Sequence, residues 1–310
     1  MSAFKRDITE LIGGTPLMEL TSIEKNENTG ARLFAKLEYF NPTGSAKDRA
    51  AWRMILDAEK SGRLTPGSAV IEPTSGNTGI SLAAIAAARG YRAIIVMPDT
   101  MSIERRKLIS AFGAEVVLTD GAKGVAGSVE KAHELAAEIP DSFIPDQFSN
   151  PSNANAHYDT TGPEIFDALD GKVDIYVATV GTGGTLTGTA RYIKEKNPNA
   201  YIAAVEPAAS PLLTKGVSGA HKIQGIGANF IPDLLDRGIY DEVIPVSDEA
   251  SYACARMAAR SEGLFVGISS GAALAAGLAL SKRAENAGKN IVVLFPDTGA
   301  RYLSTPDFID

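Results

Sequence analysis

Short apolar runs rich in valine and isoleucine alternate with longer segments of helical periodicity along most of this 310-residue chain. Because the runs are almost continuously apolar, we expect strands that helices cover on both faces. This alternation predicts an α/β fold with mainly parallel, twisted sheets and right-handed crossovers. The expected strands are residues 68–74, 92–98, 114–119, 174–180, 201–207, 241–247, 264–269 and 290–296. The expected helices are residues 77–90, 101–113, 127–139, 185–198, 248–263 and 271–288.

The composition excludes several classes of protein. Acidic residues outnumber basic ones by 37 to 30 without long runs of like charge, so we expect neither nucleic acid nor a membrane as a partner. The three histidines and the single Cys254 are scattered, which predicts no metal site and no internal disulfide. The chain lacks a basic-then-apolar signal at its start, and its most apolar stretch is too short to span a membrane. We therefore expect a cytoplasmic protein with Cys254 buried in a helix.

A turn at residues 41–49, "NPTGSAKDR", places Lys47 among small residues after an apolar run. A solvated lysine needs no such setting, whereas a lysine that binds a ligand covalently does. The amine is nucleophilic when it is neutral, and an apolar or cationic setting lowers its pKa. We therefore interpret Lys47 as the residue that forms a Schiff base.

Two glycine-rich loops each follow an expected strand and precede an expected helix. The first, "EPTSGNTG" at residues 72–79, would present the backbone N–H groups of a helix N-terminus to an anion such as a carboxylate. The alternative is simple capping by Thr74, Ser75 or Asn77. The second, "GTGGTLTG" at residues 181–188, is suited to a phosphate.

The second loop is not a dinucleotide site or a P-loop. A dinucleotide fingerprint needs glycine at the position of Leu186, although Glu206 ends the next strand where a ribose contact would be expected. A P-loop needs Lys-Ser or Lys-Thr at a spacing that is absent here. A monophosphate therefore fits the loop better than a dinucleotide.

A third loop, "GISSGAA" at residues 267–273, carries small hydroxyls but could equally be a helix N-cap. Ligands in open α/β sheets bind beyond the carboxyl ends of the strands, where all three loops are expected. A phosphate loop, a carboxylate loop and a sheltered lysine together predict a site for pyridoxal phosphate.

An ordered set of motifs then resembles the cysteine synthase (O-acetylserine sulfhydrylase) family of pyridoxal-phosphate enzymes. The resemblance runs from Leu11 nearly to the last residue. The motifs are "LIGGTPL", "NPTGSAKDR", "EPTSGNTG", "MSIERR", "GTGGTLTG", "HKIQGIG", "GISSGAA" and "RYLST". It implies a tryptophan-synthase-β-like fold (fold type II) of two α/β domains, with the cofactor in the cleft between them. Residues 1–12 and 38–153 would form the smaller, mobile domain, and residues 13–37 and 154–310 the larger one.

The resemblance also implies roles for individual residues. Lys47 would carry the cofactor and act as the acid/base, Asn77 would bind the cofactor's 3′ oxygen, and Ser269 would meet the pyridine nitrogen. The cofactor's phosphate would be held by Gly181, Thr182, Gly183, Gly184 and Thr185. The substrate carboxylate would be bound by Thr74, Ser75, Gly76, Asn77, Thr78 and Gln147.

The implied reaction is β-replacement: O-acetyl-L-serine and sulfide give L-cysteine and acetate. The same motifs serve cystathionine β-synthases and O-phosphoserine sulfhydrylases, and a non-catalytic binding paralogue is a remote alternative. Two departures from the family pattern, Asn229 and Ala300, leave the substrate preference open. The resemblance further implies a homodimer, and a possible partner in the C-terminal tail of serine acetyltransferase. The tail's carboxylate would use the loop at residues 74–79, with His221 and Lys222 nearby.

Overall fold

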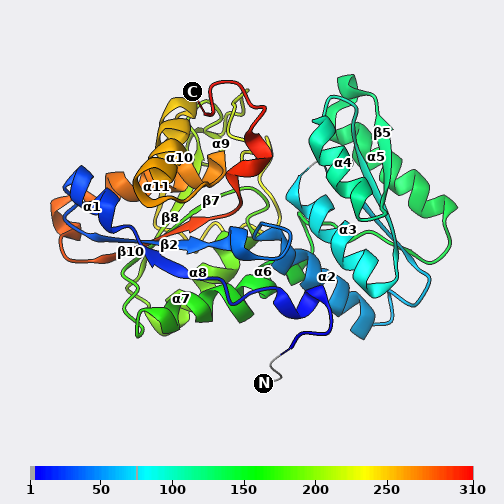
Figure 1. The fold of residues 1–310 in the computed structure, drawn as a ribbon, viewed down its shortest axis with the longest axis horizontal. Coiled ribbons are helices and arrows are strands. Elements are labelled where there is room, and N and C mark those ends of the chain that lie inside the picture. The colour runs from blue at the N-terminus through cyan, green and yellow to red at the C-terminus, as the bar shows by residue number, and fades with distance from the viewer. Residues whose placement is uncertain (1–3, 75, 310) are drawn as a thin grey trace. The chain divides into compact units, whose positions relative to one another are not determined.

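A computed structural model describes residues 4–74 and 76–309. By its internal packing the chain forms two compact units, which are described separately (Figure 1). Unit 1 comprises Met1–Ile12, Asn41–Thr43 and Lys47–Asn153, and unit 2 comprises Gly13–Phe40, Gly44–Ala46 and Ala154–Asp310. The predicted domain bounds differ in that they placed residues 38–40 and 44–46 in the smaller domain.

Unit 1 contains a four-stranded parallel sheet in the order β5-β4-β3-β6. Its strands are β3 (Ala69–Pro73), β4 (Arg92–Pro98), β5 (Glu115–Thr119) and β6 (Ser142–Phe143). Its helices are α2 (Lys47–Lys60), α3 (Asn77–Arg89), α4 (Ile103–Ala111) and α5 (Gly124–Glu138), followed by α6 (Pro151–Ala156), which crosses into unit 2. Short 3₁₀ turns lie at Ile8–Leu11 and Gly121–Lys123.

Alternate residues of these strands enter different cores, as the two-residue period of a strand requires. Val70 and Ile95 pack in a cluster with apolar residues of α2, α3 and α4. Ile71 and Ile94 face the other way and pack with Ala132 of α5. Helices therefore cover both faces of the sheet, with α2 and α3 side by side on one of them (Figure 1).

Unit 2 contains a six-stranded sheet in the order β1-β2-β10-β7-β8-β9. Only β1 runs antiparallel to its described neighbour. The strands are β1 (Leu17–Glu19), β2 (Arg32–Leu37), β7 (Ile175–Thr179), β8 (Tyr201–Pro207), β9 (Glu242–Val246) and β10 (Asn290–Phe295). The helices are α1 (Thr21–Glu27), α7 (Gly162–Ala168), α8 (Gly184–Lys196), α9 (Leu212–Lys215), α10 (Asp248–Glu262) and α11 (Ile268–Ser281). A π-helical turn lies at His157–Thr161, and 3₁₀ turns lie at Glu38–Phe40, Ala284–Asn286 and Gly299–Tyr302.

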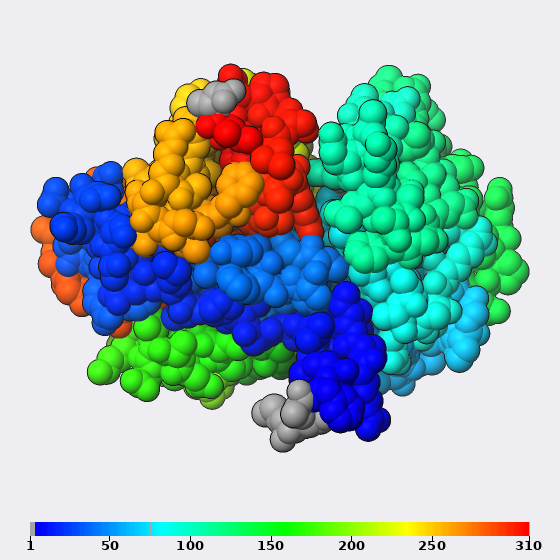
Figure 2. Space-filling view, in the orientation of Figure 1, coloured from blue at the N-terminus to red at the C-terminus, as the bar shows by residue number. Residues whose placement is uncertain are grey.

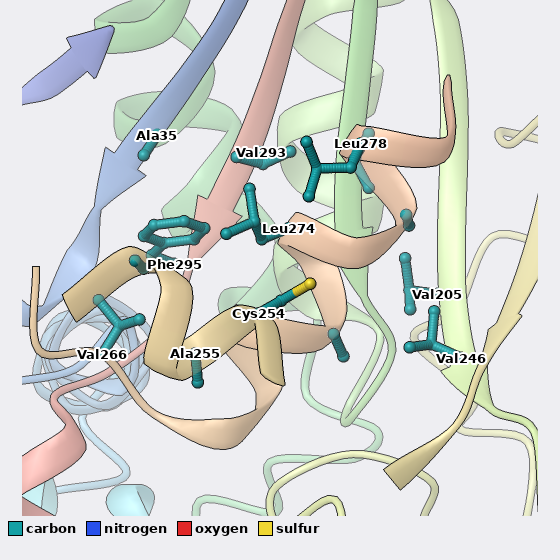
Figure 3. Packing of buried hydrophobic residues seen from close by; sticks show 14 of the residues in the cluster. Ala35, Val205, Val246, Cys254, Ala255, Val266, Leu274, Leu278, Val293 and Phe295 are labelled. Carbon is teal, nitrogen blue, oxygen red and sulfur yellow. The ribbon is translucent and has the colours of Figure 1, made fainter. Parts of the chain in front are cut away.

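Helices also cover both faces of this larger sheet (Figure 1). On one face, Leu274 of α11 packs with Val293 and Phe295 of β10, and Cys254 of α10 joins the same cluster (Figure 3). On the other face, strand residues pack with Leu186 and other residues of α8. The expectation that Cys254 is buried in a helix is thus confirmed.

Near the C-terminus, residues 307 and 308 contact α10, and this segment lies beside that helix (Figure 2). Phe308 is buried, and its ring contacts those of Tyr252 and Tyr302 at centroid distances of 6.0 and 5.8 Å. Arg256 donates to the carbonyl of Asp307 at 2.7 Å. The C-terminal segment is therefore part of the core of unit 2.

Seven of the eight expected strands are present, and the expectation for residues 264–269 is wrong. There Val266 makes only an isolated bridge to Thr298, and α11 begins at Ile268. A run of apolar residues that short fits a buried loop as well as a strand, because its burial comes from tertiary packing. The expected helix at residues 271–288 ends at Ser281. The sequence analysis did not identify β1, β2 and β6.

Within the residues that the structure describes, no helix combines the length and the apolar character needed to cross a membrane.

Candidate active site

Three helices begin at the loops singled out in the sequence, and each has a glycine at its N-cap. Gly76 precedes α3, Gly183 precedes α8 and Gly267 precedes α11. By contrast, Ser102 caps α4 and Ser247 caps α10 with their side chains. Glycine has no side chain to cap the N–H groups of the first helical turn, so these three helix starts are suited to an anionic ligand.

The loop before α8 packs closely against the backbone of residues 225 and 235. A Cβ at Gly181 would lie 2.5 Å from the carbonyl oxygen of Gly225, and a Cβ at Gly183 would lie 2.9 Å from Cα of Leu235. Gly183 also has a φ of +81°, a conformation that favours glycine. The loop follows β7 directly, so the structure places it at the carboxyl end of a central strand.

A buried histidine supports this loop, a role that the sequence analysis did not assign. His157 lies in the π-helical turn, and its Nε2 is 3.1 Å from Oγ1 of Thr185. Its Nδ1 is 2.9 Å from Oγ1 of Thr161. The spacing between His157 and Thr185 in the sequence gave no signal of this contact, because only the tertiary fold brings the two segments together.

The third loop places two serines in the first turn of α11. Ser269 is 4% exposed, and Ser270 is fully buried. Among the described residues, Oγ of Ser270 has no hydrogen-bond partner. A hydroxyl in this turn can bind a ring nitrogen, which is the role expected of Ser269.

Glu206 does not act as the ribose ligand that the dinucleotide alternative would need. Its carboxylate accepts hydrogen bonds from the backbone N–H groups of Leu213 at 2.7 Å and Thr214 at 3.2 Å. It also accepts one from the hydroxyl of Thr214 at 2.5 Å. These contacts account for the buried carboxylate without a ligand.

In unit 1, Lys47 is the first residue of α2 and is half-buried between Ala46 and Asp48. Asp48, which is 1% exposed, accepts hydrogen bonds from the backbone N–H of Thr43 at 2.7 Å and from the Thr43 hydroxyl. The carboxylate therefore closes the turn at residues 43–48 and fixes the start of the helix from which the lysine extends.

The same carboxylate links α2 to α3. Ser81 donates to Asp48 and also to the carbonyl of Asn77, the first residue of α3. Lys47 and Asn77 thus lie at corresponding ends of two helices that pack together. The sequence analysis named neither Asp48 nor Ser81, because nothing in the sequence shows which helix faces α2.

Thr78 and Gln147, both expected at the carboxylate site, are joined directly. Oγ1 of Thr78 donates to Oε1 of Gln147 at 2.5 Å, and both residues are buried. Thr74 is half-buried and accepts from the N–H of Gly76 at 3.3 Å. Ser75 lies outside the described residues.

A buried glutamate binds the backbone of the segment that contains Gln147. Glu72, at the end of β3 and 1% exposed, accepts from the N–H groups of Asp146 at 3.0 Å and Gln147 at 3.3 Å. Burial raises the pKa of its carboxyl group to about 8, and the nearby charge of Asp146 adds to the rise.

Of the two departures Asn229 and Ala300, the structure explains Asn229, and nothing in it explains an alanine at position 300. Asn229 adopts a φ of +63°, which asparagine tolerates better than most residues, and its Oδ1 accepts from Ser210 at 3.3 Å. Asn229 and Gly181 line the same small cavity in unit 2. The N–H of Ala300 donates to Oγ1 of Thr298 at 3.2 Å.

The expected site residues thus form two groups. Unit 1 brings together Lys47, Asn77, Thr78 and Gln147, and unit 2 carries the α8 loop and Ser269. A glycine-capped helix with threonine hydroxyls fits a phosphate, a helix-start lysine fits an aldehyde, and a buried serine fits a ring nitrogen. The residues present therefore fit pyridoxal phosphate. In the described part of the chain, no cluster of three or more acidic, histidine or cysteine side chains could hold a metal ion.

The model of the pyridoxal-phosphate dependent enzyme family matches residues 8–297. The chain belongs to this family. Its cofactor is pyridoxal phosphate, and it is an enzyme of the cysteine synthase type, as its relatives indicate.

A probable cysteine synthase of Bacillus subtilis is 53% identical over 299 residues, covering 96% of this chain and 95% of the relative. A cysteine synthase of Staphylococcus aureus is 48% identical and covers 97% and 96%. Among solved structures, the cysteine synthase of Entamoeba histolytica has a TM-score of 0.96 at 45% identity and covers 99% of this chain and 91% of its own. O-ureido-L-serine synthase has a TM-score of 0.94 at 41% identity, with coverages of 98% and 95%.

Gly183→Ala is expected to weaken cofactor binding at least tenfold, because its Cβ would press on Leu235 and displace the α8 loop. The matched control is Gly62→Ala, where φ is +73° but nothing lies within 4 Å. The control carries only the backbone strain, about 1–2 kcal/mol. The measurement is the dissociation constant of pyridoxal phosphate by absorbance titration. Equal affinities in the two variants would contradict the assigned role of the loop.

The raised pKa of Glu72 predicts a pH dependence of stability. The folded protein keeps a proton that the unfolded chain releases above the ordinary carboxyl pKa of 4.5. The free energy of unfolding should therefore fall as pH rises from about 4.5 to about 8, by up to ~1.4 kcal/mol per pH unit. Above about pH 8 the contribution of this proton to the free energy of unfolding is fully lost. Urea unfolding across this range should show the slope in the wild type and a shallower one in Glu72→Gln; equal slopes would contradict it.

Proposed function

We propose that the protein makes L-cysteine from O-acetyl-L-serine and sulfide, with release of acetate. The main support for the proposal is that the residues expected to bind the cofactor and the substrate are present in both units. Lys47 and the α3 loop support this in unit 1, and the α8 loop with Ser269 supports it in unit 2. The high similarity to proteins named cysteine synthase along the full length agrees with it.

When bound, pyridoxal phosphate withdraws electrons from the substrate's Cα and so makes its proton acidic. The amine of Lys47 would hold the cofactor, and the same amine would take the proton from Cα of the bound substrate. The N–H groups at the start of α3, with Thr78 and Gln147, would bind the substrate carboxylate. Acetate would leave from Cβ, a Cβ–S bond to sulfide would replace the Cβ–O bond, and Lys47 would return the proton to Cα.

The hydroxyl of Ser269 suits this reaction. A carboxylate beside the pyridine nitrogen would keep that nitrogen protonated and make the ring a strong electron sink. A serine hydroxyl does not, so negative charge is less stabilised on the ring and loss of the β-leaving group is favoured. Cystathionine formation and O-phosphoserine use remain the nearest alternatives, and the names of the relatives favour neither.

The reaction is tested by mixing the holoenzyme with O-acetylserine and then with sulfide. The cofactor's absorbance band should shift on the first addition and return on the second, as cysteine forms. Homocysteine in place of sulfide, and O-phosphoserine in place of O-acetylserine, should give slower turnover. Faster turnover with homocysteine than with sulfide, or with O-phosphoserine than with O-acetylserine, would contradict the proposed reaction and identify that compound as the substrate.

Lys47→Ala is expected to lower turnover at least ~10²–10⁴-fold, since positioned proton transfer contributes that much and covalent attachment of the cofactor is lost as well. The matched control is Lys60→Ala, which removes the exposed last residue of the same helix. Turnover by cysteine assay and covalent attachment by borohydride trapping measure the two effects. If the turnover of Lys47→Ala were within tenfold of that of Lys60→Ala, the proposed role of Lys47 would be contradicted.

We also propose a cytoplasmic homodimer, on the basis of the family resemblance. Cys254 is the single cysteine of the chain and cannot form an internal disulfide, which supports a reducing compartment. The measurement for the dimer is the mass in solution, against 32.5 kDa for one chain.

The C-terminal tail of a serine acetyltransferase is proposed to bind the carboxylate site. Within unit 2, Lys222 is exposed, with its Nζ 3.8 Å from Oδ2 of Asp307, and Nε2 of His221 lies 3.2 Å from the carbonyl oxygen of Gly227. A peptide ending in isoleucine should change the cofactor's fluorescence and compete with O-acetylserine. The amidated peptide is the control, because it lacks the terminal carboxylate. Equal binding of both peptides, or of neither, would contradict the proposal.

A further inference from the structure

Gln147 is held at three points within unit 1. Its side-chain oxygen accepts from Thr78, and its carbonyl accepts from Nδ2 of Asn153 at 2.8 Å. Its N–H donates to Glu72. The contact with Thr78 uses Oε1 of the Gln147 side chain, so Nε2 points away from Thr78. An amide NH₂ group is a donor, which is what a carboxylate ligand needs.

Glu72 is the contact that sets the backbone of this loop. Its two oxygens accept from two consecutive N–H groups, Oε2 from Asp146 and Oε1 from Gln147. Asp146 has a φ of +53°, so the chain turns sharply there and both N–H groups point to one side. When ionised, above its pKa of about 8, the carboxyl group offers one acceptor oxygen to each of these N–H groups. An amide offers one oxygen and one NH₂, which cannot accept.

We propose that Glu72 is a positioning residue for the substrate: by holding Asp146 and Gln147 it sets the place of the Gln147 amide and thereby the affinity for the substrate carboxylate. This inference rests on the proposed function, in which Gln147 contributes to the carboxylate site. Glu72 acts through Gln147 and touches neither substrate nor cofactor.

The test is Glu72→Gln in the holoenzyme at about pH 9, where the carboxyl group of Glu72 is ionised. The variant keeps the size of the side chain but faces one N–H with an NH₂ group. We expect KM for O-acetylserine to rise about tenfold or more, because a buried N–H without an acceptor displaces the loop. We expect kcat at saturating O-acetylserine and KM for sulfide to change less than threefold. Glu72→Asp keeps the carboxyl group on a shorter chain and should give an intermediate KM. If Glu72→Gln does not fold, the same KM measurement on Glu72→Asp tests the inference.

Glu206→Gln is the matched control. Glu206 also precedes a proline at a strand end, is 3% exposed and accepts two consecutive backbone N–H groups. It lies in unit 2 and holds the start of α9. We expect a similar loss of melting temperature in both variants, with KM for O-acetylserine changed less than twofold in the control. A similar rise in KM in Glu206→Gln would mean a general structural effect and would overturn the inference.

A double mutant shows whether Glu72 acts through Gln147. In the Gln147→Ala background, Glu72→Gln should add less than twofold to KM, because the group that it positions is gone. Fully additive effects would overturn the inference.

Binding of L-serine, followed by the cofactor's absorbance, separates this inference from the proposed function. If the wild type binds L-serine but makes no cysteine, the proposed reaction fails. The inference is then judged by the dissociation constant of L-serine. A rise of tenfold or more in Glu72→Gln alone supports it, and an unchanged constant overturns it.

Discussion

The N–H groups at the start of an α-helix have no partner within the helix, and this constraint organises both units of the protein. Parallel strands feed α3 and α8 from the same edge of each sheet, and both helices begin at glycine. α11 begins in the same way. A serine cap, as on α10, would satisfy the N–H groups with protein atoms. Glycine supplies no such cap, and we propose that these helix starts bind phosphate and carboxylate.

Buried carboxyl groups hold the loops around these helix starts. Asp48 closes the turn before Lys47, and Glu72 holds the segment that contains Gln147. Glu206 holds the start of α9 in the same manner. A buried carboxyl group is costly unless N–H or O–H donors satisfy it, so each of these loops is fixed in one conformation.

Solved structures similar to this one carry more than one activity in their names. They include an O-ureido-L-serine synthase at 41% identity and a hydrogen sulfide-producing enzyme of Fusobacterium nucleatum at 45%. Fold alone therefore does not define the substrate. Asn229, which adopts a left-handed conformation beside the phosphate loop, is one place where this chain differs from the family pattern.

The sequence by itself determined the fold class, most strands, the cofactor and the family, because strand and helix periods and glycine-rich loops are local signals. It did not identify β1, β2 and β6, and it misread residues 264–269, since a short apolar run has no period to distinguish loop from strand. The tertiary structure alone decided which polar groups meet. His157 contacts Thr185, Asp48 contacts Ser81 and Glu72 contacts Gln147, each between segments separated by 28 to 75 residues. Such pairs depend on how helices and strands pack, and no local pattern records them.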